Sequence, residues 1–306
     1  MAAPDSREQL LEYYDYVIVD EAARSDLGDL LIPLTLGRRI LLVGDQKQLP
    51  PFIDDNVARK LEADDPDAAV LLRERTLFDD LFDRLPDTNR IMLNVQYRCH
   101  PHIGDAISRA FYDGELHSGS ELREGIAYEQ WIEKKIPQWG LFENRPLVWV
   151  DSGPRSAQVR SAANPIETEF AMKLVLQAIA AQGTKPARPF LGLIAFYSGQ
   201  VTGLKQALAS AIPDYDDWLE IGTVDSFQGK EYPLVILCCS NHDRHGRVGF
   251  LGLPNRVNVA LSRPQRQLII IGSRSTLLHK ENGSLPFKEF ASAAGGNLFD
   301  GTKSFD

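Results

Sequence analysis

The stretch Tyr16–Pro51, YVIVDEAARSDLGDLLIPLTLGRRILLVGDQKQLPP, decides the fold of this chain. It contains two short apolar runs, Tyr16–Val19 and Ile40–Val43, and polar residues follow each run closely. Short runs that are rich in β-branched residues and lack polar alternation are typical of buried parallel strands. Ligands of open α/β sheets bind beyond the carboxyl ends of such strands. The sequence therefore predicts a parallel sheet with a functional site beyond the ends of these two runs.

Two carboxylates, Asp20 and Glu21, end the first apolar run. One carboxylate can hold Mg²⁺ while its neighbour faces a water molecule, which is an arrangement that phosphoryl transfer uses. The alternative is a strand that ends in a solvated acidic turn, and the acidic pair alone does not decide between the two. The string GDQKQLPP at Gly44–Pro51 is far more specific, and it favours the first interpretation.

At these residues the chain resembles the superfamily 1 helicases, in particular the branch that includes the nonsense-mediated-decay helicases and their bacterial and archaeal relatives. DEAA is similar to motif II of that family, and GDQKQLPP is similar to motif III. Other segments follow in the family's order: QYRCHP (96–101) resembles motif IV, IAFYSGQ (194–200) a nucleic-acid motif, TVDSFQGKE (223–231) motif V, and NVALSRPQ (258–265) motif VI. The resemblance implies an α/β fold of RecA-like P-loop NTPase lobes with parallel sheets.

The same resemblance implies that ATP and Mg²⁺ are the cofactors. Asp20 would reach the Mg²⁺ ion, Glu21 would be the general base for the attacking water, and Gln48 would sense the γ-phosphate. Arg98 would clamp that phosphate, and Arg263 would be an arginine finger in a cleft between the two lobes. A surface arginine at a helix end is the alternative for Arg263.

Further nucleotide contacts are implied for Tyr97, Gln228, Gly229 and Glu231. Tyr97 would stack on the base, although it can equally be a core aromatic. Glu231 would contact the ribose or a lysine of the first lobe, and Gly229 permits close backbone approach.

Nucleic-acid contacts are implied for Tyr197, Thr223 and Asp225. A tyrosine can stack on any base, although a tyrosine at a helix start needs no ligand. The implied partner is single-stranded DNA or RNA, without a choice between them, and the family resemblance suggests 5′→3′ movement.

No G-x-x-x-x-G-K-[ST] phosphate loop occurs in the sequence. Gly229-Lys230 does not form one, because Glu231 stands where a Ser or Thr must bind Mg²⁺. We therefore expect an incomplete first lobe over residues 1–92, a second lobe over 93–285 and a flexible tail over 286–306. An N-terminal helicase segment or a separate subunit would supply the phosphate loop. The expected function is thus that of an ATP-dependent helicase or translocase, present as a fragment or split subunit. The alternative is a non-catalytic nucleic-acid-binding remnant of a helicase.

The net charge of −9 is unevenly distributed. Residues 1–94 hold 20 acidic and 11 basic residues, which gives the whole −9, whereas residues 241–280 hold one acidic and seven basic residues. A basic surface within an acidic protein can face phosphates. The sequence contains no run of 18 apolar residues, so it predicts no membrane span, and the N-terminus does not resemble a secretory signal. The three cysteines lack disulfide or metal spacing, so we expect a cytoplasmic protein.

Local signals predict three further details. Ser25 would cap a helix that ends at Leu36, with Gly37 just past its end. Ile91–Val95 would be a strand. The glycines of the last segment, such as Gly295, favour mobility at 286–306.

Overall fold

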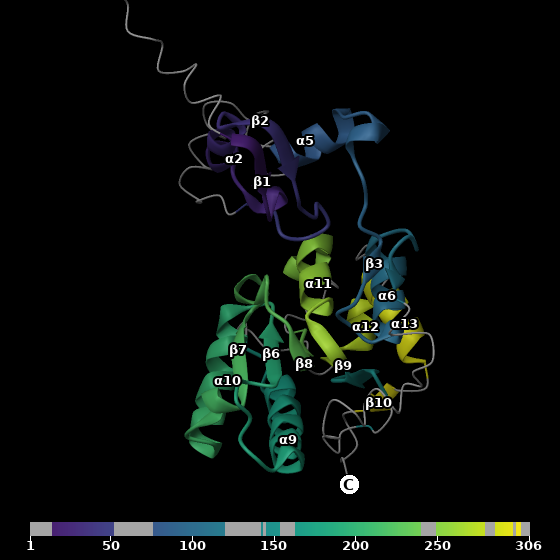
Figure 1. The fold of residues 1–306 in the computed structure, drawn as a ribbon. Helices are drawn as coiled ribbons and strands as arrows, with labels where there is room; N and C mark the ends of the chain where they lie inside the picture. The colour runs from purple at the N-terminus through teal and green to yellow at the C-terminus, as the bar shows by residue number, and fades with distance from the viewer. Residues whose placement is uncertain are drawn as a thin grey trace, which may run out of the picture. The chain divides into compact units, whose positions relative to one another are not determined.

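The structure is a computed structural model that describes residues 14–51, 76–119, 142, 145–153, 163–239, 249–278, 285–295 and 298–300. The chain divides into two compact units, Met1–Met92 and Leu93–Asp306 (Figure 1). The predictions for the N-terminal lead-in and the acidic loop at 54–67 lie outside the described residues. Of the basic segment at 241–280, residues 241–248 and 279–280 lie outside the described residues. No helix in the described part of the chain has the length and apolar character to cross a membrane.

Unit 1 contains a two-stranded parallel sheet. Its strands are β1 (Tyr14–Val19) and β2 (Gly37–Leu42), which pair Ile18 with Leu41. The turn η1 (Ala22–Arg24) and the helices α2 (Leu27–Leu34) and α5 (Leu77–Arg84) lie beside it. A small core joins them, made by Val19, Ala22, Ala23, Leu30, Leu34, Leu42, Leu77 and Phe78. The predicted parallel pairing of the two apolar runs is therefore present.

One face of this small sheet is bare among the described residues. Val19 and Leu42 reach the core, whereas Tyr16, Ile18 and Leu41 on the other face are 59%, 66% and 52% exposed. Parallel strands are normally covered on both faces. The prediction that both runs are buried is thus wrong for one face in this chain.

Unit 2 is built on a six-stranded sheet in the order β10-β5-β9-β8-β6-β7, in which every neighbouring pair is parallel. The strands are β5 (Leu147–Asp151), β6 (Leu191–Ala195), β7 (Leu219–Thr223), β8 (Tyr232–Cys238), β9 (Pro264–Ile271) and β10 (Leu298–Asp300). Most residues of β5 to β9 are fully buried, which is what continuous apolar runs predict.

Helices cover both faces of the larger sheet (Figure 1). The helices α9 (Pro165–Gln182) and α10 (Ser198–Ala211) pack on one face through side chains such as Leu174 and Leu204. On the other face α13 (Leu285–Ala294) packs against β5, where Phe287 meets Trp149 edge to face at 6.1 Å. The helices α6 (Pro101–Phe111) and α11 (Pro254–Leu261) pack with α13. A short helix α12 (Arg274–Leu277) and the small parallel pair β3 (Val95–Gln96) and β4 (His117–Ser118) complete the unit. Short 3-10 turns η4 (Tyr215–Asp217), η5 (Val224–Phe227) and η6 (Gly249–Gly252) link these elements. The turn η2 (Asp87–Asn89) belongs to unit 1.

Several local predictions need correction. Asp26, not Ser25, caps α2 by accepting a 2.8 Å hydrogen bond from the Asp29 amide. Gly37 begins β2 instead of ending the preceding helix. The strand predicted at 91–95 is reduced to Val95–Gln96. The tail predicted to be flexible contains most of α13 and all of β10, because buried Phe287 and Phe290 anchor α13.

Candidate functional site

Unit 1 places its acidic pair beyond the ends of the two strands. Val19 and Leu42 pair at the end of the sheet, and the amide of Val43 donates to the Val19 carbonyl at 2.8 Å. Asp20 and Glu21 follow directly, and both are exposed. The Asp20 Oδ1 atom accepts a 2.9 Å hydrogen bond from the Glu21 amide. Two accessible carboxylates at one strand end are suitable ligands for a hydrated Mg²⁺ ion.

The backbone around the acidic pair is constrained. Glu21 has φ 54° and ψ 33°, a left-handed conformation that few residues other than glycine adopt. Gly44 lies so close to the next turn that a Cβ atom on it would meet the Ala23 nitrogen at 2.8 Å. A strained backbone such as that of Glu21 persists only where surrounding contacts fix it, and such strain is common at functional sites.

Gln48 is held by Asp45, which the sequence analysis did not assign to the site. The Gln48 Nε2 atom donates to Asp45 Oδ2 at 2.7 Å, and the Gln48 amide donates to the Asp45 carbonyl at 3.1 Å. The Asp45 Oδ1 atom also accepts from the Lys47 amide at 2.9 Å. Asp45 therefore closes the turn and orients the side chain of Gln48.

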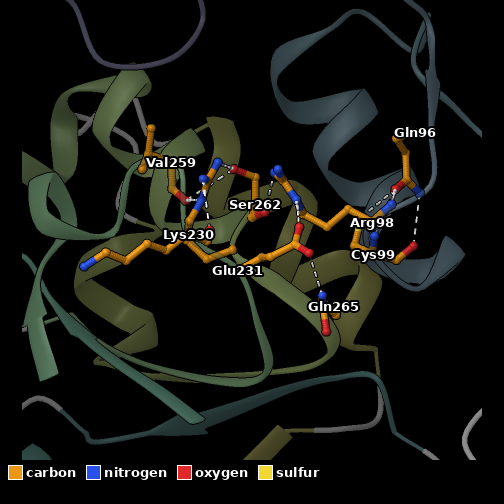
Figure 2. Close-up of polar contacts among 9 residues, drawn as sticks. Gln96, Arg98, Cys99, Lys230, Glu231, Val259, Ser262 and Gln265 are labelled. Atoms are coloured by element: carbon orange, nitrogen blue, oxygen red, sulfur yellow. Dashed lines mark hydrogen bonds and ion pairs between the residues drawn. The ribbon is translucent and has the colours of Figure 1, made fainter. Parts of the chain in front are cut away.

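Unit 2 brings together the residues that resemble motifs IV, V and VI, as Figure 2 shows. The Arg98 Nε atom donates to Glu231 Oε2 at 2.7 Å, and Arg98 Nη1 lies 3.4 Å from the Ser262 carbonyl. The other oxygen of Glu231, Oε1, accepts from Gln265 Nε2 at 2.7 Å. Three segments that are far apart in the sequence thus meet at one carboxylate.

Gln96 shapes the loop that carries Arg98. Its Oε1 atom accepts from the amides of Arg98 and Cys99, both at 2.9 Å. Its Nε2 atom donates to the Cys99 carbonyl at 3.1 Å and to Ser118 Oγ at 2.8 Å. Gln96 was not predicted as a site residue, although it is the first residue of the QYRCHP segment.

Arg263 is buried, which the sequence did not indicate. The residue is only 1% exposed. Nε donates to the Val259 carbonyl at 2.8 Å, Nη1 to the Lys230 carbonyl at 3.2 Å, and Nη2 to Ser262 Oγ at 2.7 Å. The guanidinium therefore links α11 to the segment before β8. The alternative of a surface arginine at a helix end is wrong.

Electrostatics at this site favour a charged Glu231. Burial acts to raise the pKa of Glu231, but hydrogen bonds from Arg98 and Gln265, together with the charges of Arg98 and Arg263, lower it overall. The carboxylate therefore stays ionised and keeps its pair with Arg98 at neutral pH.

His100 stays neutral beside the site. Burial, followed by the charges of His102 and Arg266, lowers the pKa of His100 to about 3. Its Nδ1 atom accepts from the His102 amide at 3.1 Å and so caps α6. A neutral imidazole is required for that acceptor role.

The segment that resembles motif V runs between opposite ends of the sheet. Thr223 ends β7, whereas Glu231 immediately precedes β8. Gly229 has φ 76°, which glycine adopts readily and other residues rarely do. Gln228 is buried, and its Oε1 atom has no hydrogen-bond partner in the described part of the chain.

The predicted nucleic-acid residues lie at the carboxyl ends of β6 and β7. Ala195 pairs with Thr223 there, so half-buried Tyr197 and exposed Asp225 follow adjacent strand ends. Asp225 Oδ1 accepts from Arg256 Nη2 at 3.0 Å. These residues are therefore separated along the strands from Arg98, Glu231 and Arg263, which lie near the amino ends of β8 and β9.

Tyr97 is 62% exposed, so the alternative that it is a core aromatic is wrong. Its ring packs over Gly119, where an added Cβ would come within 2.0 Å of Cε1. An exposed ring next to Arg98 is available for stacking.

Comparison with known proteins agrees with these motifs. A family described as AAA domain matches residues 73–275, and a second AAA domain family matches residues 3–56. The chain belongs to the AAA domain family. Its relatives include a regulator of nonsense transcripts and an ATP-dependent helicase, so the resemblance inferred from the motifs is confirmed.

Two relatives show how far the similarity extends along each chain. A regulator of nonsense transcripts 1 homolog from Neurospora crassa is 32% identical over 289 residues, covering 92% of this chain and 24% of the relative. The ATP-dependent helicase NAM7 from Saccharomyces cerevisiae is 30% identical over 269 residues, covering 85% and 25%. The match to the solved structure of the arterivirus nonstructural protein 10 helicase covers 88% of this chain and 40% of the helicase chain, at 17% identity and a TM-score of 0.38. The chain thus spans about a quarter of the length of the two sequence relatives. The predicted α/β fold with parallel sheets is confirmed by the structure itself.

Proposed function

We propose that this chain is part of an ATP-dependent helicase or translocase that acts on single-stranded DNA or RNA. The observation that carries the proposal is the convergence of Arg98, Glu231 and Gln265 from three distant segments (Figure 2). Among the described residues, Nη2 of Arg98 has no hydrogen-bond partner, and Nη1 has only the long contact to the Ser262 carbonyl. A guanidinium held at Nε with its Nη end accessible is suited to binding phosphate oxygens.

The acidic pair of unit 1 supplies the complementary chemistry. Asp20 would hold Mg²⁺ through its water shell, and Glu21 would accept a proton from the attacking water. Gln48, oriented by Asp45, would sense the γ-phosphate. Bound Mg²⁺ would offset the charge of the phosphate oxygens of ATP. Tyr97 would stack on the base, and Gln228, Gly229 and Glu231 would line the nucleotide site.

The nucleic acid would bind at the carboxyl ends of β6 and β7. Tyr197 can stack on bases there, and Thr223 and Asp225 lie beside it. The relatives support this because they are described as helicases, as in the case of NAM7.

The bare face of the unit 1 sheet is a suitable surface for the segment that would carry the phosphate loop. Tyr16, Ile18 and Leu41 form an apolar surface on a parallel sheet of which, among the described residues, the other face alone packs on the core of unit 1. Arg39 lies over the Tyr16 ring at 5.3 Å and donates a hydrogen bond to its hydroxyl. We propose that a segment carrying G-x-x-x-x-G-K-[ST], in the same polypeptide or in a separate subunit, covers this face.

ATP turnover by the purified chain tests the function. Turnover is measured with and without single-stranded DNA or RNA, and after addition of the segment that precedes the matched region in the Neurospora relative. We expect turnover only with the added segment, and its loss in Arg98→Ala. No turnover in any mixture, with both pieces folded, would contradict the helicase proposal.

The second candidate function is a non-catalytic nucleic-acid-binding remnant. The burial of Arg263 favours it, because a finger enclosed by protein carbonyls is poorly placed to reach a phosphate. This candidate predicts salt-dependent nucleic-acid binding that ATP does not change.

A further inference from the structure

Gln265 connects two parts of the candidate nucleotide site, and no role was assigned to it from the sequence. Its side chain donates from Nε2 to Glu231 Oε1 at 2.7 Å. Its backbone carbonyl accepts from the His100 amide at 2.8 Å, just after Arg98 in the chain. One residue of β9 therefore touches both the carboxylate that binds Arg98 and the loop that carries it.

Glu231 has two anchors, one on each oxygen (Figure 2). Oε2 binds Arg98 and Oε1 binds Gln265, and these are the only hydrogen bonds of its side chain within the described ranges. The side chain of Glu231 is 44% exposed and that of Arg98 is 39% exposed, so surrounding packing alone does not fix either one. Exposed ion pairs are mobile unless further contacts restrict them.

The direction of the Arg98 contact matters for function. Glu231 occupies Nε, which leaves the Nη end available for phosphate. Glu231 is therefore a tether for Arg98 and does not compete for that end. If Glu231 were free to rotate, its carboxylate could also pair with the Nη end.

We propose that Gln265 is a positioning residue that fixes Glu231 and thereby holds the Nη end of Arg98 ready for phosphate. This inference rests on the proposed role of Arg98 in ATP binding. A neutral amide suits the task because it donates without competing for the guanidinium. A glutamate at position 265 would repel Glu231, and a lysine would compete with Arg98 for it.

The test uses the full chain labelled with ¹⁵N in arginine. The Arg98 Nε–Hε resonance is assigned by its loss in Arg98→Lys, and its hydrogen-exchange rate is compared in the unsubstituted chain, Gln265→Ala and Gln265→Glu. Gln177→Ala, at an exposed position of α9, is the matched control. The backbone contact of Gln265 with His100 survives in every variant. If Gln265→Ala fails to fold, Gln265→Asn replaces it, since it shortens the side chain by one methylene.

Loss of the amide contact should accelerate exchange at the Arg98 Nε about three- to tenfold, which is the effect of one hydrogen bond of ordinary strength. Gln265→Glu should accelerate exchange further, and Gln177→Ala should leave it unchanged. An unchanged rate in Gln265→Ala or Gln265→Asn, or an equal change in Gln177→Ala, would overturn the inference.

A second measurement separates this inference from the proposed function. Mg²⁺ and ATP are titrated into the unsubstituted chain together with the phosphate-loop segment while the Arg98 resonance is followed. If ATP leaves that resonance unmoved although Gln265→Ala accelerates exchange, Gln265 positions Arg98 but Arg98 does not bind ATP, so only the proposed function fails.

Discussion

Replacing Arg263 with alanine should destabilise unit 2 much more than replacing Arg98. Arg263 is 1% exposed and donates hydrogen bonds to the carbonyls of Val259 and Lys230 and to Ser262 Oγ. The Val259 carbonyl keeps hydrogen bonds from the Ser262 amide and hydroxyl in Arg263→Ala, whereas the Lys230 carbonyl loses the hydrogen bond from Arg263 Nη1.

The magnitude follows from these contacts. Loss of the part-buried hydrogen bond to the Lys230 carbonyl costs at most about 1–3 kcal/mol, and each of the other two bonds contributes about 1.5 kcal/mol. The emptied volume adds to the cost, whereas removing a buried charge returns part of its desolvation free energy. We expect a net loss of about 3 kcal/mol for Arg263→Ala. Arg98→Ala breaks a half-exposed ion pair and should cost no more than about 1 kcal/mol.

Urea denaturation followed by tryptophan fluorescence measures both losses. All four tryptophans, including buried Trp149, lie in unit 2, so the signal reports that unit alone. A loss below about 1 kcal/mol for Arg263→Ala would refute the reasoning, because it would mean that the buried bonds do not hold this side chain. If the loss is as large as expected, reduced ATPase activity of Arg263→Ala does not by itself identify an arginine finger.

Three further outcomes are expected. Gly44→Ala should lower the free energy of unfolding of unit 1, by about 1–3 kcal/mol, because its Cβ would meet the Ala23 nitrogen; circular dichroism during denaturation measures it. The pKa of His100 is depressed to about 3, so its stabilising effect is complete above the unfolded-state pKa and declines as pH falls from about 6.5 toward 3. The variant His100→Asn keeps a capping acceptor but does not titrate in this range. Between pH 6.5 and pH 5 its free energy of unfolding should therefore fall by about 2 kcal/mol less than that of the unsubstituted chain; equal falls would show that His100 is not the cause of the pH dependence. Tyr197→Ala should weaken single-stranded nucleic-acid binding by about 1–3 kcal/mol in fluorescence anisotropy, whereas Tyr197→Phe, which keeps the ring, should bind normally. Equal weakening by both Tyr197 variants would exclude stacking.

The fold was largely predictable because its strands are short, apolar and continuous. The runs ending at Val19 and Val43 pair in parallel. The strand at Leu191 pairs in parallel with the one at Leu234, and the strand at Leu147 with the one at Leu268. Such runs remain recognisable whatever they pack against. Burial of the first two was not predictable from their composition, because it depends on whether other segments cover Ile18 and Leu41.

The site was predictable as a set of side chains but not as a set of contacts. The resemblance to motifs identified Arg98, Glu231 and Arg263, yet it could not show that Arg263 is enclosed by the carbonyls of Val259 and Lys230. Backbone acceptors have no sequence signature. The anchoring role of Gln265 was hidden for the same reason, because it depends on the neighbouring strands β8 and β9.

Strand β10 has a consequence for the order in which unit 2 is built. It pairs with β5 at the edge of the six-stranded sheet, although its residues follow those of every other strand. During synthesis, Leu147–Asp151 can pair with β9 while its outer backbone groups still lack a neighbour. Unpaired strand edges recruit other chains, so nascent or C-terminally shortened forms should be the most prone to aggregation.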